Sequence, residues 1–189
     1  PERRSSSGFH GLMMPRSLQT GEHNALWSDA WRHLAGVASI TLALAWWLSE
    51  SLIAGPEMLA FATAVSVAAA VALAVGRSVL ERTHPFESLG AANRITLIRA
   101  GLVVLLMGFM LHPGNAATAW LAVAIASVSA ALDAFDGPAA RRSGMASRFG
   151  ARFDMETDAL LILVLAVLAW RWDRGGAWVL LSGLMRYGF

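Results

Sequence analysis

The sequence predicts an all-α protein, a polytopic bundle of transmembrane helices. Hydrophobic residues make up 56% of the 189 residues and charged residues only 15%, with a mean hydropathy of +0.52. Long apolar runs recur along the chain, and about 20 apolar residues are what a helix needs to cross a hydrocarbon core of ~30 Å. Arginines gather between these runs. These observations exclude an ordinary soluble domain, and they exclude disorder except at the ends.

The composition also excludes several kinds of chemistry. The chain has no cysteine, which excludes disulfides, thiol catalysis and zinc–thiolate sites. All 15 basic residues are arginine, so a lysine nucleophile, a Schiff base and a P-loop are excluded as well. The formal net charge of +2 is too small to indicate nucleic-acid binding.

The polar segment 1–32 is expected to form a loose tail, followed by two transmembrane helices within residues 33–76. Segment 77–94 fits either a short interfacial helix or a plain loop. Two further apolar runs follow this segment. The four runs that are each expected to span the membrane are 34–53, 58–75, 95–111 and 116–132.

The last two apolar runs are shorter than a membrane span. As a helix, run 159–170 is only ~18 Å long. To span the membrane, this helix must begin near Gly150, which places Asp154 and Asp158 at membrane depth. Run 177–189 covers ~20 Å before the sequence stops. Because the chain also begins with Pro1, we expect a fragment cut inside a transmembrane helix.

Arginine placement predicts the orientation of these helices. Twelve of the 15 arginines precede the first run, surround segment 77–94 or follow run 116–132. The short turns at 55–56 and 112–115, on the opposite side of the membrane, contain no arginine, while Arg171 and Arg174 are expected on that opposite side. By the positive-inside rule the twelve arginines mark the cytoplasmic face of a cytoplasmic or inner membrane.

The residues with the clearest chemistry are aspartates at the junction of two expected helices. Asp133 and Asp136 are three apart and share one helix face, and Gly150, Asp154 and Asp158 are spaced by four. The two helices are expected to be antiparallel neighbours, so these carboxylates can converge. They would repel one another without a cation, and hard oxygen ligands suit Mg²⁺ or Mn²⁺.

Nearby residues suit a ligand that carries phosphate. Gly137 and Gly150 leave the backbone open to close approach, and Arg141 offers a planar fork for a phosphate. The residues alone also allow two other interpretations. The aspartates could be helix caps paired with Arg141 or Arg142, or they could line a cation-transport site.

Eight residues of this segment, at their spacings, resemble the complete signature of the CDP-alcohol phosphotransferase (CDP-alcohol phosphatidyltransferase) family: Asp133, Asp136, Gly137, Ala140, Arg141, Gly150, Asp154 and Asp158. Asn93, Thr96 and Arg99 are similar to the opening of that family's first core helix. The resemblance covers residues 77–189 and implies an incomplete six-helix core, cut in its fourth helix and preceded by two extra transmembrane helices.

The resemblance implies an enzyme of phospholipid biosynthesis. It would move a substituted phosphate (phosphatidyl) group from a CDP-linked lipid, such as CDP-diacylglycerol, to an alcohol acceptor and release CMP, although the fragment itself could be inactive. The resemblance implies a protein in the lipid bilayer with a cavity open to the cytoplasm. A homodimer is an assembly to test, and no nucleic-acid partner is expected.

The resemblance also implies roles for the site residues. The implied ligands of Mg²⁺ or Mn²⁺ are Asp133, Asp136, Asp154 and Asp158, and Asp158 would also be the general base. The implied binding residues for the CDP moiety are Gly137, Ala140, Arg141 and Gly150.

Two alternatives to phosphatidyl transfer are compatible with the sequence. Intramembrane prenyltransferases also hold Mg²⁺-diphosphate on aspartate motifs, but those motifs lie farther apart than the 26 residues from Asp133 to Asp158. A transporter or a non-catalytic homologue could use the same acidic cation site. The residues after Asp154 differ from the Pro-x-Ala of many phosphatidylglycerophosphate synthases, so glycerol 3-phosphate is not singled out as the acceptor.

Overall fold

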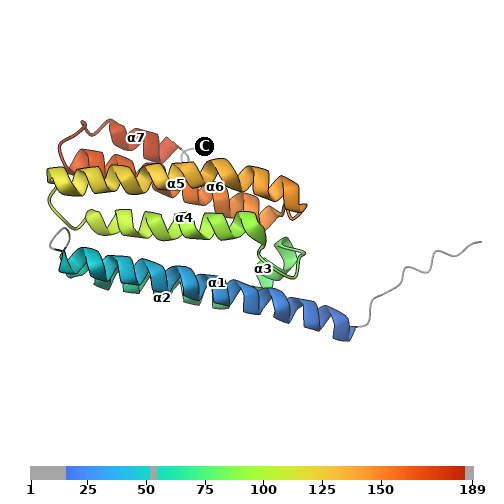
Figure 1. Ribbon diagram of the computed structural model, residues 1–189. Coiled ribbons are helices and arrows are strands. Elements are labelled where there is room, and N and C mark those ends of the chain that lie inside the picture. The colour runs from blue at the N-terminus through green and yellow to red at the C-terminus, as the bar shows by residue number, and fades with distance from the viewer. Residues whose placement is uncertain (1–15, 52–54, 186–189) are drawn as a thin grey trace, which may run out of the picture.

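The computed structural model describes residues 16–51 and 55–185, with the side chains of 24–51, 55–135 and 144–185. Within these ranges the regular secondary structure is entirely helical, and the long helices lie side by side in one bundle (Figure 1). The helices are α1 (Arg16–Glu50), α2 (Glu57–Val75), α3 (Arg77–Thr83), α4 (Gly90–Phe109), α5 (Ala116–Ser143), α6 (Arg148–Arg171) and α7 (Val179–Leu184). The predicted all-α bundle is confirmed.

Helix α4 is the centre of the bundle. It contacts α1, α2, α5 and α6, and half of its apolar stretch is buried, compared with 11% of that of α2. Its side chains Val103, Leu106 and Phe109 are completely buried in the main apolar core. A side chain on α4 can therefore reach groups on both α5 and α6.

The ends of α5 and α6 are fixed by local capping. The Asn115 side chain accepts a hydrogen bond from the Thr118 N–H at 2.9 Å, and α5 then continues past the predicted end at Leu132 to Ser143. It ends at Gly144, whose φ of 64° is left-handed, a conformation that glycine adopts without a steric penalty. Helix α6 begins at Arg148, close to the predicted start near Gly150, because the Ser147 hydroxyl accepts the Gly150 N–H at 3.1 Å.

The N-terminal half differs from the expectation at one element. The expected loose tail over residues 1–32 is wrong from Arg16 onward, where α1 begins. Leu26 and Ala30 are four residues apart on one face of α1, and both are buried with Leu80 and Leu89. This narrow apolar face stabilises the helix although its surroundings in the sequence are polar. Segment 77–94 begins with the short helix α3.

The turns that follow α1, α4 and α6 lie together at one end of the bundle. The Gly55 N–H donates to His112 Nε2 at 2.7 Å, and the Trp172 Nε1–H donates to the His112 carbonyl at 3.1 Å. The turns after α1, α4 and α6 therefore meet at this end. The junctions from α3 to α4 and from α5 to α6 lie at the other end (Figure 1).

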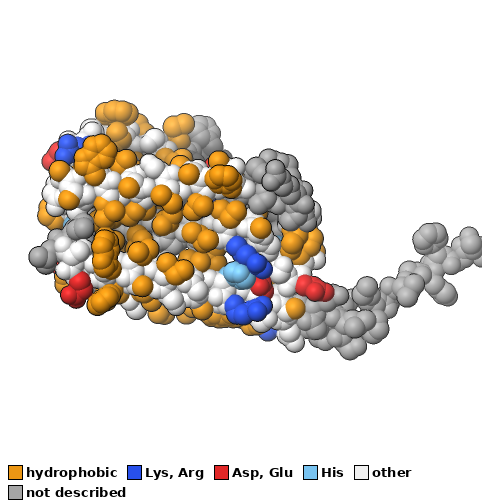
Figure 2. Space-filling view, viewed as in Figure 1, with side chains coloured by type: hydrophobic (Ala, Val, Ile, Leu, Met, Phe, Trp, Pro, Cys, Tyr) orange, Lys and Arg blue, Asp and Glu red, His pale blue; other side chains and the backbone are white. Residues whose placement is uncertain are grey.

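Three helices of the described ranges are long and apolar enough to cross a membrane: 57–75, 90–109 and 116–135. Their outward surfaces are apolar, as Val67 and Trp120 illustrate with exposed fractions of 58% and 75%. Figure 2 shows hydrophobic side chains along the middle of the bundle and charged ones toward its ends. The expected first span is helical to Glu50, and α7 covers six residues of the expected last run.

Candidate functional site

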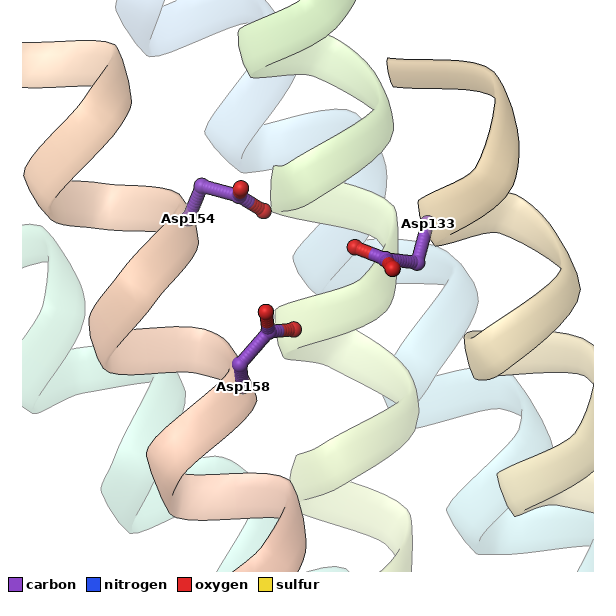
Figure 3. Close-up of side chains that lie close together, drawn as sticks. All are labelled: Asp133, Asp154 and Asp158. Carbon is purple, nitrogen blue, oxygen red and sulfur yellow. The ribbon is translucent and has the colours of Figure 1, made fainter. Parts of the chain in front are cut away.

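Among the described side chains, three of the predicted aspartates come together in space. Asp133 on α5 and Asp154 and Asp158 on α6 each offer a carboxylate oxygen, and these oxygens lie within 4.8 Å of one another. Figure 3 shows the three side chains pointing toward one another across α4. The spacing of four places Asp154 and Asp158 on the same face of α6, as predicted.

A buried arginine lies among these carboxylates. Arg99 Nη1 lies 2.8 Å from Asp133 Oδ1 and 2.7 Å from Asp154 Oδ1, and Arg99 Nη2 donates to Asp158. The Arg99 side chain is only 1% exposed, whereas the three aspartates are 35–46% exposed. Arg99 thus fixes α4, α5 and α6 to one another at a single point, with the carboxylates open on their outer side.

From the sequence, Arg99 is expected among the arginines of the cytoplasmic face and at the opening of a helix, and its place in the acidic site is not predicted. The signal was nevertheless present. Asn93, Thr96 and Arg99 are spaced by three on one face of α4, and all three are at most 4% exposed. An arginine on a buried helix face requires acidic partners, because an uncompensated buried charge is costly.

The donor set fits a divalent cation. Among the described side chains of the cluster, one guanidinium faces three carboxylates, so the site keeps an excess of negative charge. Carboxylates are hard oxygen ligands, and each has two oxygens, so one carboxylate can bind a guanidinium and a metal ion together. Mg²⁺ or Mn²⁺ suits this set, and Asp133, Asp154 and Asp158 are the described side chains that could hold it.

Gly150 on α6 lies against Asn93 in the first turn of α4. A Cβ at Gly150 would collide with Oδ1 of Asn93, whose exposed fraction is 4%. Asn93 is itself held by a 2.6 Å hydrogen bond from its Nδ2 to the Leu89 carbonyl. In this structure Gly150 therefore permits close packing of α4 against α6, and the role in CDP binding that the resemblance implies remains a prediction.

The other predicted residues lie on the last turns of α5. Asp136, Gly137, Ala140 and Arg141 are in the helical backbone, and their side chains lie outside the described ones. By position, Asp136 follows Asp133 by one helical turn on the same face.

A small cavity adjoins the carboxylates between α6 and α7. Its volume is about 190 Å³, and Asp158 lies in its wall with Met155, Ala159 and Ile162 of α6 and with Ser182 and Gly183 of α7. Asp158 therefore faces both the Arg99 cluster and a space that a small polar group could enter.

One comparison with known proteins gives a match over the part of the chain that carries these residues. Neither curated proteins nor solved structures give a match to the chain. Residues 89–189, from the start of α4 onward, match the family described as CDP-alcohol phosphatidyltransferase, and this range includes Arg99 and all the predicted aspartates. Since the match spans more than half of the sequence, the chain belongs to the CDP-alcohol phosphatidyltransferase family.

Proposed function

We propose that the protein carrying this chain transfers a phosphatidyl group from a CDP-linked lipid to an alcohol and releases CMP. Family membership supports phosphatidyl transfer from a CDP-alcohol in general. The observation that carries the finer proposal is the convergence of Asp133, Asp154 and Asp158 on one point beside a cavity. Together with the apolar helices, the family makes this a multi-pass membrane protein.

A divalent cation is part of the proposal. The family is generally dependent on divalent cations, and the acidic cluster provides the ligands. When bound, Mg²⁺ or Mn²⁺ would neutralise the charge of the substrate diphosphate. Asp133, Asp136 and Asp154 would hold the cation, and Arg99 would keep the carboxylates at a fixed separation before substrate enters.

The transfer step assigns a separate role to Asp158. The acceptor oxygen forms a bond to the β-phosphorus as the bond from that phosphorus to the oxygen of CMP breaks. The acceptor proton passes to the carboxylate of Asp158, which has the position of a general base at the edge of the cavity. Gly137, Ala140, Arg141 and Gly150 are proposed to border the CDP moiety. In the orientation inferred from the arginines, this site faces the cytoplasm.

The test is CMP release by the full-length protein in detergent or vesicles. CDP-diacylglycerol is supplied with glycerol 3-phosphate, myo-inositol or serine in turn, with Mg²⁺, Mn²⁺ or EDTA. We expect CMP release that needs both a divalent cation and one of the alcohols, which also names the acceptor. Binding of CDP-diacylglycerol without CMP release for every alcohol would contradict the proposal and favour the non-catalytic alternative.

A further inference from the structure

We propose that His84, which lies outside the family-matched residues, is a positioning residue for the helix that carries Asp154 and Asp158. His84 follows α3, and its side chain is 1% exposed. Both of its ring nitrogens have partners: Nδ1 is 2.7 Å from the Ser147 hydroxyl, and Nε2 is 2.7 Å from the Ser88 carbonyl. The inference rests on the proposed function and extends it to the N-terminal region of the chain.

The partners determine the tautomer of the neutral ring. A carbonyl oxygen can only accept, so Nε2 carries the proton that is donated to Ser88. Nδ1 then accepts from the Ser147 O–H, while the same hydroxyl oxygen accepts the Gly150 N–H at 3.1 Å. One continuous set of hydrogen bonds therefore runs from the segment before α4, through His84, to the first turn of α6.

These hydrogen bonds act on the residue that caps the N-terminus of α6. Ser147 is the N-cap of the helix, so its hydroxyl sets where the first turn starts and in which direction its N–H groups point. Asp154 and Asp158 follow on the next turns of the same rigid helix, and a change at the cap would move both carboxylates relative to Arg99.

Aromatic packing holds the His84 ring in this orientation. Phe86 lies edge-on at 5.3 Å between ring centroids, and Phe149 of α6 lies edge-on at 6.0 Å. Phe149 in turn stacks on Phe153 at 5.7 Å, directly before Asp154 in the sequence. The ring thus contacts α6 through a hydrogen bond and through packing, which is the arrangement expected of a group that fixes a helix in place.

Two substitutions separate the two hydrogen bonds of His84. In His84→Asn the side-chain oxygen takes about the place of Nδ1 and can accept from Ser147. In His84→Gln the amide takes about the place of Nε2 and keeps only the bond to Ser88. His112→Asn is the matched control, because it removes the hydrogen bond of a partly buried histidine at the opposite end of the bundle.

Two readouts are measured on full-length protein: CMP-release kinetics, and Mn²⁺ binding followed by electron paramagnetic resonance. We expect His84→Gln to lower kcat by about tenfold or more, with a smaller change in KM for CDP-diacylglycerol, and to weaken Mn²⁺ binding. We expect His84→Asn to retain most of the kcat and of the Mn²⁺ affinity of the wild type. We expect His112→Asn to change neither the kcat nor the Mn²⁺ affinity.

Mn²⁺ binding unchanged in His84→Gln, or absent from the wild type, would overturn the positioning role. Equal losses in His84→Asn and His84→Gln would overturn it too, because the cap bond would then not be the cause. A wild type that releases no CMP would refute the proposed function alone, and the Mn²⁺ comparison would still decide the role of His84.

Discussion

Arg99 Nη1 lies 2.7 Å from Asp154 Oδ1, and this contact joins α4 to α6 across 55 residues of sequence. The same guanidinium pairs with Asp133 of α5, so one buried cation fixes three helices. Because Arg99 holds Asp154 and Asp133 together, the acidic site is organised by a fixed charge of the protein itself.

Removing the charge of Arg99 should destabilise the protein most strongly without metal. In Arg99→Met the three carboxylates repel one another without a counter-charge. The loss of unfolding free energy should stay below the ~3–5 kcal/mol of a fully buried pair, because these carboxylates are 35–46% exposed. We expect a lower thermal midpoint in EDTA and partial recovery with Mn²⁺. Arg82→Met, at an exposed position of α3, is the control. A midpoint in EDTA equal to that of the wild type would refute the counter-ion role.

A methyl group at Gly150 should separate α4 from α6 next to the site. Gly150→Ala brings a Cβ against Asn93 Oδ1, and we expect CMP release to fall by about 10- to 100-fold. Adding Asn93→Ala, which removes the obstructing amide, should recover part of the loss. Gly36→Ala is the control, because the added methyl group at this helical position meets open space. Its activity should persist, and its free energy of unfolding should rise by up to about 1 kcal/mol, because alanine favours a helix more than glycine does. A fully active Gly150→Ala would show that the close approach is unimportant.

Asp29 should make stability depend on pH below about 4. Its carboxylate lies before the first expected span and accepts hydrogen bonds from the Leu89 N–H at 3.0 Å and from Arg94 at 3.3 Å. Burial raises the pKa of Asp29, but these partners outweigh burial, so the pKa lies below its ordinary value. The folded state then binds fewer protons than the unfolded state, and this contribution to stability is lost as the pH falls through the lowered pKa.

The measurement for Asp29 is the thermal midpoint of the wild type and of Asp29→Asn between pH 3 and pH 7. The wild type should have the higher midpoint at pH 7, and the difference should shrink as the pH falls below about 4. A difference that stays constant over this range would show that Asp29 does not contribute through its charge.

Asp133 should be needed for binding of the metal ion. In Asp133→Asn the half-saturating Mn²⁺ concentration for CMP release should rise by about tenfold or more. Asp173→Asn is a suitable control, since Asp173 is exposed beyond the end of α6 and its φ of 53° is one that asparagine also adopts. An unchanged Mn²⁺ titration in Asp133→Asn would remove Asp133 from the ligand set.

The sequence was sufficient to predict the bundle and the convergence of Asp133, Asp154 and Asp158, because apolar run length and helical spacing are local properties. It did not predict the partner of those aspartates. Arg99 is 34 residues from Asp133, and only tertiary packing brings α4 between α5 and α6. The bridge from His84 to Ser147 spans 63 residues and has no local pattern at all. The start of α1 was missed because its buried face, with Leu26 and Ala30, is narrow within a polar segment.

The most direct test of the central claim is Asp158→Asn in the full-length protein, measured as CMP release from CDP-diacylglycerol beside binding of the same lipid. The amide keeps the shape of the side chain but cannot take the proton of the acceptor. We predict that CMP release falls by at least about 100-fold while CDP-diacylglycerol and Mn²⁺ still bind. CMP release within about tenfold of the wild type would contradict the assignment of Asp158 as the base.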